Sequence, residues 1–445
     1  MKNAFKEVTG SVVAPQGFLA SGVFCDIKRL GTGKGSDKGP KRDLALIVSE
    51  VPATAAGMFT TNQVCAAPVK VCLEHLRAGR RGQAIVVNSG NANACTGRPG
   101  LADARAMAAA TAAALHLPRT EVLVASTGRI GVRMPMANVR EGIRRAAALL
   151  GNAPEHAAEA AEAIMTSDTR PKQVALEFML DGQRVRIGGI AKGAGMIQPG
   201  MSETGRRPAA RPLHATMLCF LTTDAAIGAP ALQAALQEAT AQSFNRITVD
   251  GDMSTNDTVL ILANGLAGNS AARLRSRASR DAQVFQAALN RVCLDLAQMI
   301  VRDGEGVTRF VTVRVEGAEN DADADAAARA VANSALVKTS WFGGDPNWGR
   351  IIDALGYSTA AVNEDRVDIG YSAPGSRRIL WSLRRGQPTR ATFEALCAAV
   401  AANEFDLHIR LNLGRGRAVI YAADLTEEYV EFNKGDVSDP ASLGG

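Results

Sequence analysis

The sequence predicts an α/β protein, in which apolar strands alternate with Ala-rich amphipathic helices. Apolar runs such as residues 84–88 and 122–126 end in Asn, Ser, Thr or Gly, which is typical of buried strands that finish in tight turns. Segments such as residues 101–115 and 139–150 place apolar residues three and four positions apart, which indicates helices. The 445 residues are 47% hydrophobic but only 4% aromatic. We therefore expect two or three domains with cores of Ala, Val, Leu and Ile.

The first half of the chain supplies strands and helices in turn. We expect short strands in residues 11–30 and a solvated hairpin loop in the Gly- and Lys-rich segment 30–42, which lacks the Gly-Lys-Ser/Thr sequence of a phosphate-binding loop. Asp181-Gly182 stands between two alternating runs and predicts a β-hairpin over residues 176–187. The other predicted elements are strands at 84–88 and 122–128 and helices at 101–115, 139–150 and 154–165.

The second half begins with residues 217–224, an apolar run that predicts a strand buried on both faces. The aromatic-rich segment 341–350 predicts a specifically packed element in a chain with few aromatic residues. The acidic residues of 247–252 fit either a divalent-cation site or turn caps, and we favour caps. The remaining predicted elements are helices at 231–244 and 285–300, a strand at 309–315 and an exposed Ala/Asp-rich helix at 318–335.

The composition argues against several classes of protein. The net charge is +6, but Lys and Arg are dispersed, and no nucleic-acid-binding module is recognisable. No apolar run approaches the ~18 to 20 residues of a membrane span, and the first residues lack the apolar stretch of a secretory signal. The seven cysteines form no Cys-x-x-Cys pair, and the five histidines lack metal-ligand spacing, so we predict neither a disulfide framework nor a metal site. We therefore expect a cytoplasmic protein.

The strongest functional signal is Lys192-Gly-Ala-Gly-Met-Ile-Gln-Pro199, followed by His214-Ala-Thr-Met-Leu218. A lysine among glycines, and then a hydroxyl residue at the head of an apolar strand, is the pattern of an active-site turn. The hydroxyl of threonine is un-ionised at pH 7, but cutting the chain immediately before it frees an α-amine that can act as its base. The pKa of an α-amine, about 7.7 to 8.0, is close enough to neutral for that task. Thr216 is therefore the candidate nucleophile.

Two other positions have both a functional and a structural interpretation. Thr127 and Gly128 end the predicted strand 122–128; a hydroxyl and a closely approachable amide can stabilise an oxyanion, and they can equally form a strand-ending turn. Glu305 stands between two glycines, where it can bind the amine of an amino-acid substrate or lie in a solvated turn. The residues alone leave these alternatives open.

The lysine motif and the Ala-Thr-Met-Leu sequence resemble the signature of the ornithine acetyltransferase family of arginine biosynthesis, also called glutamate N-acetyltransferase. Members of that family cleave themselves between the matching Ala and Thr. The likeness spans nearly the whole chain, in the same order. The other motifs that carry it are Val87-Asn-Ser-Gly-Asn-Ala-Asn-Ala94, Ala125-Ser-Thr-Gly-Arg-Ile-Gly131, Met165-Thr-Ser-Asp-Thr-Arg-Pro171, Asp250-Gly-Asp-Met-Ser-Thr-Asn-Asp257, Asp303-Gly-Glu-Gly306 and Trp341-Phe-Gly-Gly-Asp-Pro-Asn-Trp-Gly-Arg350.

The resemblance implies self-cleavage between Ala215 and Thr216 into an α chain (1–215) and a β chain (216–445), assembled as an α2β2 heterotetramer. It implies layered sheets and helices in two parts, with the active site between them. The implied reaction moves acetyl from N-acetylornithine to glutamate through acetyl-Thr216 and needs no metal or redox cofactor; some members of the family also accept acetyl-CoA. The implied roles are an oxyanion hole at Thr127 and Gly128 and substrate contacts at Thr169, Lys192, Thr216, Glu305, Asn433 and Ser438.

Two departures from the family pattern stand next to the expected cleavage site. Gly200 to Leu213 separate the lysine motif from Thr216 by about thirteen residues more than the family pattern does, and His214 replaces the usual Met. The extra residues lack apolar periodicity, so we expect a solvated loop that adds nothing to the core. Two rival hypotheses are a related acyltransferase or amidohydrolase with a different acceptor, and a non-catalytic scaffold whose chain stays uncleaved.

Overall fold

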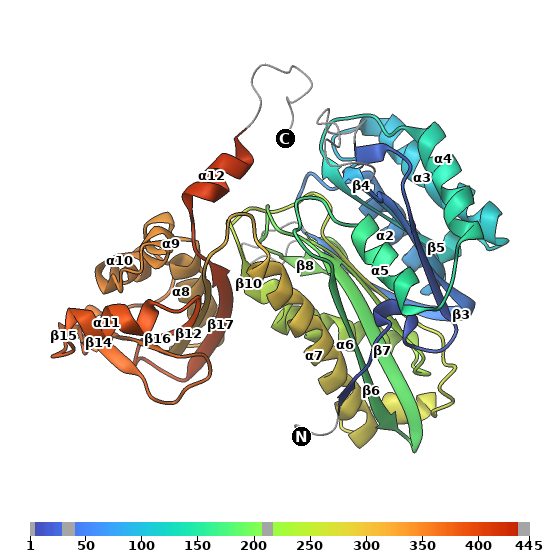
Figure 1. Ribbon diagram of the computed structural model, residues 1–445. Helices are drawn as coiled ribbons and strands as arrows, with labels where there is room; N and C mark the ends of the chain where they lie inside the picture. The colour runs from blue at the N-terminus through green and yellow to red at the C-terminus, as the bar shows by residue number, and fades with distance from the viewer. Residues whose placement is uncertain (1–4, 29–40, 207–216, 435–445) are drawn as a thin grey trace.

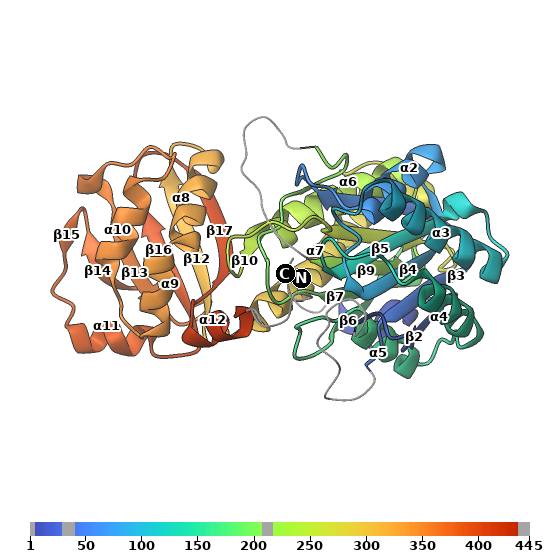
Figure 2. The same ribbon diagram turned by 90° about the horizontal axis from the view of Figure 1, so that it is seen from above.

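A computed structural model describes residues 5–28, 41–206 and 217–434, which form a large and a small lobe side by side (Figures 1 and 2). Each lobe is built on one sheet covered by helices, which confirms the predicted α/β class. The large lobe extends to the end of α7 (Arg280–Arg302), and the small lobe is built from β12 (Phe310–Ala318) onward, joined by the short strand β10 (Ile247–Thr248) from the preceding part of the chain. Residues 303–309 connect the two lobes.

In the described residues, the large sheet has ten strands in the order β1-β6-β7-β9-β11-β3-β4-β5, and β2 and β8 also pair with β3. Its strands are β1 (Lys6–Glu7), β2 (Phe18–Val23), β3 (Leu44–Thr60), β4 (Arg81–Asn91), β5 (Val122–Arg129), β6 (Lys172–Leu180), β7 (Gln183–Lys192), β8 (Met201–Ser202), β9 (Leu218–Thr223) and β11 (Thr258–Ala263). The predicted hairpin is confirmed, because Leu180 pairs with Gln183 across the Asp181-Gly182 turn. β2 and β3 form a second antiparallel hairpin, while its predicted loop falls mainly on residues 29–40, outside the described residues.

Strand β9 lies in the middle of this sheet. It pairs with β7 in antiparallel and with β11 in parallel orientation, and every one of its residues is buried. The prediction of a strand buried on both faces is therefore confirmed. β9 belongs to the predicted β chain and β7 to the predicted α chain, so one continuous sheet contains strands from both proposed cleavage products.

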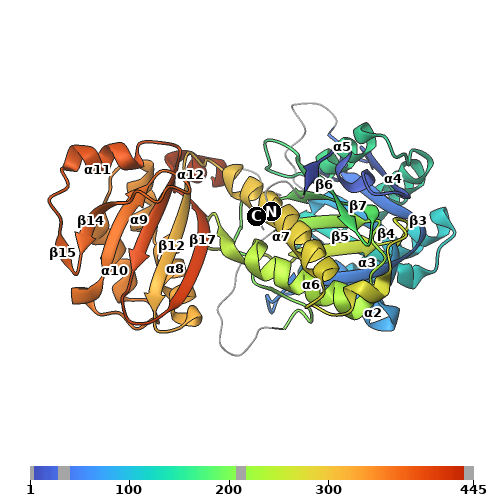
Figure 3. The same cartoon turned by 90° about the horizontal axis from the view of Figure 1, so that it is seen from below.

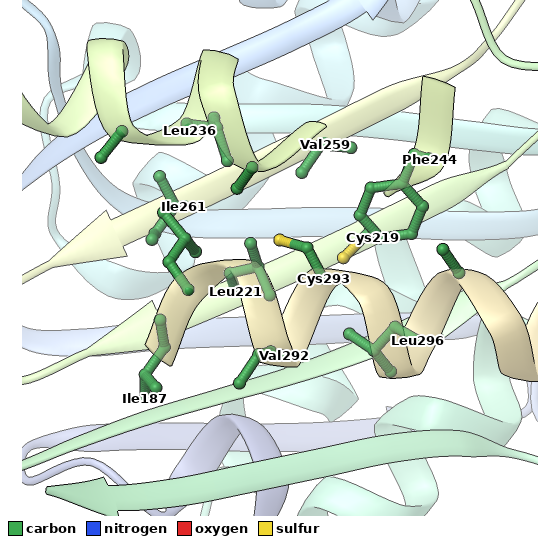
Figure 4. Packing of buried hydrophobic residues seen from close by; sticks show 14 of the residues in the cluster. Ile187, Cys219, Leu221, Leu236, Phe244, Val259, Ile261, Val292, Cys293 and Leu296 are labelled. Carbon is green, nitrogen blue, oxygen red and sulfur yellow. The ribbon is translucent and has the colours of Figure 1, made fainter. Parts of the chain in front are cut away.

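Helices cover the large sheet and supply its cores. α6 and α7 pack on one face, where Leu221 and Ile261 of the sheet meet Leu236, Val292 and other apolar residues (Figures 3 and 4). α2 to α5 pack against β2 to β5 in two further clusters of Ala, Val, Leu and Ile. The helices are α2 (Ala67–Gly79), α3 (Gly97–Leu115), α4 (Met136–Ala148), α5 (Pro154–Ala163), α6 (Ala229–Gln242) and α7. The short 3-10 helices of this lobe are Ser11–Val13, Arg119–Glu121, Phe244–Arg246 and Ala271–Leu274.

α7 is the one helix among the described residues that is long and apolar enough to cross a bilayer. Its apolar residues, such as Val292 and Leu296, are fully buried against α6 and the sheet (Figure 4). A core helix of a globular lobe passes the same test of length and composition. We therefore assign α7 to the core of the large lobe.

The small lobe has a seven-stranded sheet in the order β10-β17-β12-β16-β13-β14-β15, counted within the described residues. Its strands are β10 (Ile247–Thr248), β12, β13 (Asp368–Ser372), β14 (Leu380–Arg384), β15 (Gln387–Pro388), β16 (Glu404–Arg410) and β17 (Gly416–Ala423). Its helices are α8 (Asp321–Asn333), α9 (Ala335–Phe342), α10 (Trp348–Gly356), α11 (Phe393–Val400) and α12 (Glu427–Asn433), with a 3-10 turn at Glu364–Arg366. α8 to α11 share one apolar core with the sheet.

Two sequence expectations for this lobe have different outcomes. Trp341 is buried in the core, which confirms a specifically packed element in the segment 341–350. The prediction that residues 318–335 form an exposed helix is wrong, because α8 buries Ala324, Ala328 and Val331 against β12 and β17. Alanine side chains let a helix lie close to a sheet, while Asp321 and Asp323 lie in the first turn and Asp325 forms ion pairs with Arg246 and Arg329.

The start of the inserted segment also differs from expectation. Met201 and Ser202 form β8, which pairs with the end of β3, and the side chain of Asn245 bonds both the amide and the carbonyl of Met201 at 3.0 and 3.1 Å. Met201 is 3% exposed. The prediction of a solvated loop over residues 201–212 is therefore wrong for Met201 and Ser202, which extend the sheet. Residues 207–213 of the insertion lie outside the described residues.

Candidate active site

Three strand ends of the large sheet meet at one place. Lys192, the last residue of β7, pairs with Leu218, the first residue of β9. The ammonium Nζ of Lys192 donates a 3.4 Å hydrogen bond to the hydroxyl of Thr127 near the end of β5. The structure thus brings the lysine motif and the predicted oxyanion residue to the end of β9 that follows Thr216 in sequence. Thr216 itself and Ala215 lie outside the described residues.

Thr127 and Gly128 have the geometry of hydrogen-bond donors at a strand end. The hydroxyl of Thr127 accepts from Lys192, and because an ammonium group can only donate, the hydroxyl keeps its own hydrogen for another partner. Gly128 is exposed between two buried residues and has a φ of 126°, where a side chain is strained. A Cβ at this position would overlap the backbone of Gly90 and Asn91. Glycine is therefore required, and its backbone is accessible to a ligand.

Lys192 lies next to a buried network of charged side chains that the sequence did not predict. Lys172 Nζ bonds Asp168 at 2.6 Å and Asp303 at 2.5 Å, and all three side chains are at most 3% exposed. Asp168 also accepts the amide of Gly193 at 2.7 Å and lies 3.9 Å from Lys192 Nζ. Asp168 and Asp303 stand inside the quoted motifs, but the sequence does not indicate that these two segments meet.

The network sets the protonation of its members. Burial lowers the pKa of Lys192, and the carboxylate of Asp168 partly opposes that effect. Burial alone would raise the pKa of Asp168, but the ammonium groups of Lys192 and Lys172 hold it well below its ordinary value. Asp168 is therefore a fixed negative charge that attracts the proton of Lys192 and orients its ammonium group.

Thr169 is placed by the same network. Its hydroxyl donates to one oxygen of Asp303, and its amide donates to the other at 3.1 Å. Thr169 is exposed, whereas Asp303 is buried. The hydroxyl proton of Thr169 is committed to Asp303, so towards a further partner this hydroxyl can act only as an acceptor.

Glu305 contacts both the lysine motif and the C-terminal helix. Its amide bonds the carbonyl of Ala194 at 3.0 Å, and a side chain at Gly195 would overlap its carboxylate. Asn433, at the end of α12, donates to Glu305 Oε2 at 2.9 Å. The structure thus brings together two predicted substrate contacts, and half-buried Glu305 lies in a packed turn rather than a freely solvated one. Ser438, another predicted contact, lies outside the described residues.

Two aspartates between residues 250 and 257 accept hydrogen bonds from the backbone amides of neighbouring segments. Asp250 accepts the amides of Met196 and Ile197 at 2.6 and 2.8 Å and so fixes the end of the lysine motif. Asp257 accepts the amide of Met217 at 2.5 Å. The contacts of Asp250, which also accepts the amide of Asp252 at 3.2 Å, confirm the interpretation of the acidic residues of 247–252 as caps. Within residues 5–28, 41–206 and 217–434, no group of three His, Cys, Asp or Glu side chains is placed to hold a metal ion.

The assembled groups suit an acyl-transfer reaction, in which the carbonyl oxygen of an amide or ester becomes an anion. A threonine hydroxyl, an accessible glycine and a lysine surround one end of the site and can stabilise a developing negative charge. The carboxylate of Glu305 can bind an ammonium group at another point. Most of these residues come from the large lobe, whereas Asn433 comes from α12, the last helix of the small lobe, so both lobes contribute to the site.

Comparison with protein families gives one match over most of the chain. The model of the ArgJ family matches residues 21–435. The Arginine biosynthesis bifunctional protein ArgJ of Symbiobacterium thermophilum is 47% identical over 426 residues, which cover 96% of this chain and 98% of that protein. The Glutamate N-acetyltransferase of Methanocaldococcus jannaschii is 43% identical over 432 residues, which cover 96% of this chain and 98% of that protein.

Two solved structures are also similar in sequence. The Arginine biosynthesis bifunctional protein argJ from Bacillus halodurans is 41% identical and covers 44% of this chain and 98% of its own, with a TM-score of 0.41. The ornithine acetyltransferase from Mycobacterium tuberculosis, solved with ornithine, is 42% identical and covers 44% of this chain and 100% of its own, with a TM-score of 0.40.

Proposed function

The chain belongs to the ArgJ family, as its motifs predict, and from this premise we propose that it transfers the acetyl group of N-acetylornithine to glutamate, in arginine biosynthesis. It is a glutamate N-acetyltransferase, and the acetyl group is carried on Thr216 between two half-reactions. Self-cleavage at Ala215-Thr216 first frees the α-amine of Thr216 and gives chains of residues 1–215 and 216–445. The observation that carries this proposal is the meeting of Lys192, Thr127 and the start of β9.

The first half-reaction is an acyl transfer to a hydroxyl. The oxygen of Thr216 attacks the acetyl carbonyl, and its proton passes to the α-amine. The carbonyl oxygen becomes an oxyanion, which the hydroxyl of Thr127 and the amide of Gly128 stabilise. The α-amine then gives its proton to the nitrogen of the departing ornithine. In the second half-reaction, the amine of glutamate attacks the acetyl ester and breaks its bond to the threonine oxygen. The α-amine takes the proton from the attacking nitrogen and passes it to that oxygen, which restores the threonine hydroxyl.

The charged groups hold the amino-acid part of both substrates. We assign the α-carboxylate or the developing oxyanion to Lys192, whose charge Asp168 fixes in place. We assign the free amine of ornithine to Glu305, and the hydroxyl of Thr169 and the side-chain amide of Asn433 complete the contacts. Ser438 remains a predicted contact from the sequence. Both half-reactions are acyl transfers, so the chemistry as proposed uses no metal or redox cofactor.

Self-cleavage is tested on the purified protein. Intact-mass measurement should find fragments of 215 and 230 residues, the second beginning Thr216-Met-Leu. Thr216→Ala should stay a single chain and lack activity, whereas Thr222→Ala, in β9, should still cleave, because its hydroxyl bonds the carbonyl of Val12. A wild-type chain that stays whole and still transfers acetyl would refute the proposal.

The acetyl-threonine intermediate is tested by kinetics. Initial rates against N-acetylornithine at several glutamate concentrations should give parallel lines, because the acetyl group leaves one substrate before the other reacts. Intersecting lines would indicate a ternary complex. Radiolabelled acetyl should appear in glutamate; its release to water alone would favour an amidohydrolase. Acetyl-CoA, offered in place of N-acetylornithine, tests whether this chain also uses a second donor.

The assembly and location remain proposals from the family. We place the cleaved chains in an α2β2 heterotetramer in the cytoplasm, with small-molecule substrates. The sheet shared by β7 and β9 supports a stable association of the two cleavage products, since their separation would expose the fully buried strand β9. Light scattering of the cleaved protein measures the assembly directly.

A further inference from the structure

Two adjacent buried residues connect the strands on which the site is built. Asn256 and Asp257 precede β11 and are 2% and 0% exposed. Their side chains bond different strands: Asp257 bonds the start of β9, and Asn256 bonds the ends of β4 and β5. The Cα atoms of these two residues are joined by one peptide unit and are about 3.8 Å apart. Two adjacent side chains therefore connect β9 to β5, the strands that the proposed mechanism brings together.

Asp257 holds the residue that follows the proposed nucleophile. Its Oδ1 accepts the amide of Met217 at 2.5 Å, and the carbonyl of Met217 accepts the amide of Thr258 at 3.1 Å. The peptide of Asp257 is itself held, since its carbonyl accepts the amide of Thr60 at 2.8 Å. Met217 is fully buried. Both backbone groups of Met217 are thus fixed by the Asp257-Thr258 segment.

Asn256 holds the strand that carries the proposed oxyanion hole. Its Nδ2 donates to the carbonyls of Ala92 at 2.7 Å and Ser126 at 2.8 Å, and Ser126 immediately precedes Thr127. Its Oδ1 accepts the hydroxyl of Thr255 at 2.5 Å, and its amide bonds Ser254 Oγ at 2.9 Å. The Asn256 side chain therefore has little freedom to move.

We propose that Asn256 and Asp257 are a pair of positioning residues that sets the distance between the nucleophile strand β9 and the oxyanion strand β5 in the acetyl-transfer reaction. The inference rests on the proposed function. Neither side chain takes part in the chemistry. A displacement of about 1 Å between reacting groups can lower a rate about a hundredfold, so loss of either contact should lower kcat more than it changes KM.

The form of Asp257 that fits this role is the neutral acid. Burial raises its pKa well above the usual range, while the hydrogen bond from the Met217 amide and the charge of Lys192, on β7, act in the opposite direction. Oδ2 is buried and has no hydrogen-bond partner among the described residues. A protonated carboxyl has nearly the shape and hydrogen-bonding groups of an amide. Asparagine at position 257 should therefore substitute for it.

The test measures kcat and KM per cleaved chain, and melting temperature, for five variants of the full-length protein. Asp257→Ala and Asn256→Ala should each lower kcat by about 10- to 100-fold, with KM within threefold, and the double variant should lose far less than the product of the two losses. Asp257→Asn should keep kcat within threefold. Asp224→Ala is the matched control: Asp224 follows the other end of β9 and accepts the amides of Arg186 and Gln16 at 2.7 and 3.0 Å. It should lower the melting temperature and leave kcat within threefold.

The outcomes separate this inference from the proposed function. A wild-type protein that neither cleaves nor transfers acetyl refutes the proposed function. With an active wild type, a folded Asp257→Ala or Asn256→Ala protein with normal kcat overturns the inference. So does an Asp257→Asn protein that is unfolded or as defective as Asp257→Ala. If Asp257→Ala fails to fold, Asn256→Ala and Asp257→Asn still decide.

Discussion

The ammonium group of Lys192 donates a hydrogen bond of 3.4 Å to the hydroxyl of Thr127, although the two residues are 65 positions apart in the chain. Both groups are almost fully buried at the ends of their strands. The bond uses a lone pair of the threonine oxygen and leaves the hydroxyl hydrogen to donate. A cation and a donor are thereby placed together where the acetyl oxygen would become negative.

Replacement of Thr127 by valine keeps its shape and removes the donor. We expect kcat to fall by about 100- to 1,000-fold, which is the usual loss for one oxyanion-hole donor, while Thr127→Ser stays within about tenfold. The control is Thr222→Val, because Thr222 is a buried threonine of β9 with a structural bond to Val12. This control should lower the stability of the protein without changing kcat. A folded Thr127→Val enzyme with normal kcat would show that other hydrogen-bond donors form the oxyanion hole.

Replacement of Lys192 by methionine removes the cation and keeps most of the side-chain volume. Asp168 retains its bond to Lys172 at 2.6 Å, so the fold should survive. Because the charge next to the reacting carbonyl is lost, we expect kcat to fall by roughly 100-fold, measured in the acetyl-transfer assay.

The matched control for Lys192 is Lys338→Met in the small lobe. Lys338 is also a buried lysine; its Nζ donates to the carbonyl of Ala423, and burial lowers its pKa to about 8. Its loss should lower the melting temperature and leave kcat within about threefold. Equal loss of kcat in the two variants would mean that the effect of Lys192 is on the fold alone.

Glu305→Gln tests the proposed site for the substrate amine. The variant keeps a polar side chain beside Asn433 but removes the negative charge. We expect KM for N-acetylornithine to rise about tenfold, roughly 1.4 kcal/mol, with a smaller change in kcat. Glu431→Gln, an exposed carboxylate of the same helix α12 that pairs with Lys434, should change neither constant. A Glu305→Gln enzyme with unchanged KM would remove this residue from the substrate site.

The pH dependence of stability tests the neutral form of Asp257. Its folded-state pKa is raised by burial, so from the unfolded value of about 3.9 up to the folded value the native state holds one more proton than the unfolded state. The free energy of unfolding therefore falls as pH rises through this window, by at most ~1.4 kcal/mol per pH unit. Asparagine does not titrate, so the Asp257→Asn protein lacks this pH-dependent contribution to the free energy of unfolding.

The comparison uses the single-chain Thr216→Ala protein as the parent, with and without Asp257→Asn. From pH 5 to pH 7, the melting temperature of the Asp257→Asn protein should rise relative to that of its parent. Calorimetry or thermal fluorescence measures the difference. A gap that does not change with pH would show that Asp257 has no raised pKa in the folded state.

The insertion supplies a prediction that the structure modifies. Removal of Gly200 onward would delete β8 and its bonds to Asn245, so the deletion should start at Glu203 and end at Pro212. The exposed ion pair of Glu203 with Arg80 should contribute little, and the length of a flexible loop changes stability by only ~0.6 kcal/mol per doubling. We expect cleavage and transfer within about tenfold of the parent. A folded deletion protein without activity would place the loop in the substrate pocket.

The sequence by itself determined the elements and the family. The apolar run after residue 216 has no polar side to expose, so it predicts a strand buried on both faces, and β9 is one. Asp181-Gly182 between alternating runs can only turn the chain back on itself, and β6 and β7 pair as predicted. The motifs around Lys192 and Thr127 identified the family because they depend on local residue types.

Only the tertiary structure decided which segments meet. Asp168, Lys172 and Asp303 form one buried network, yet each is an ordinary polar residue of its own segment when the sequence is read alone. The exposed helix predicted at 318–335 was wrong for a related reason. Its alanines give too weak an apolar signal to show that a sheet covers them, and burial depends on the partner. The same holds for Asn256 and Asp257, whose side chains bond backbone groups of strands distant in sequence; local pattern does not encode such contacts, because they arise only when the sheet has assembled.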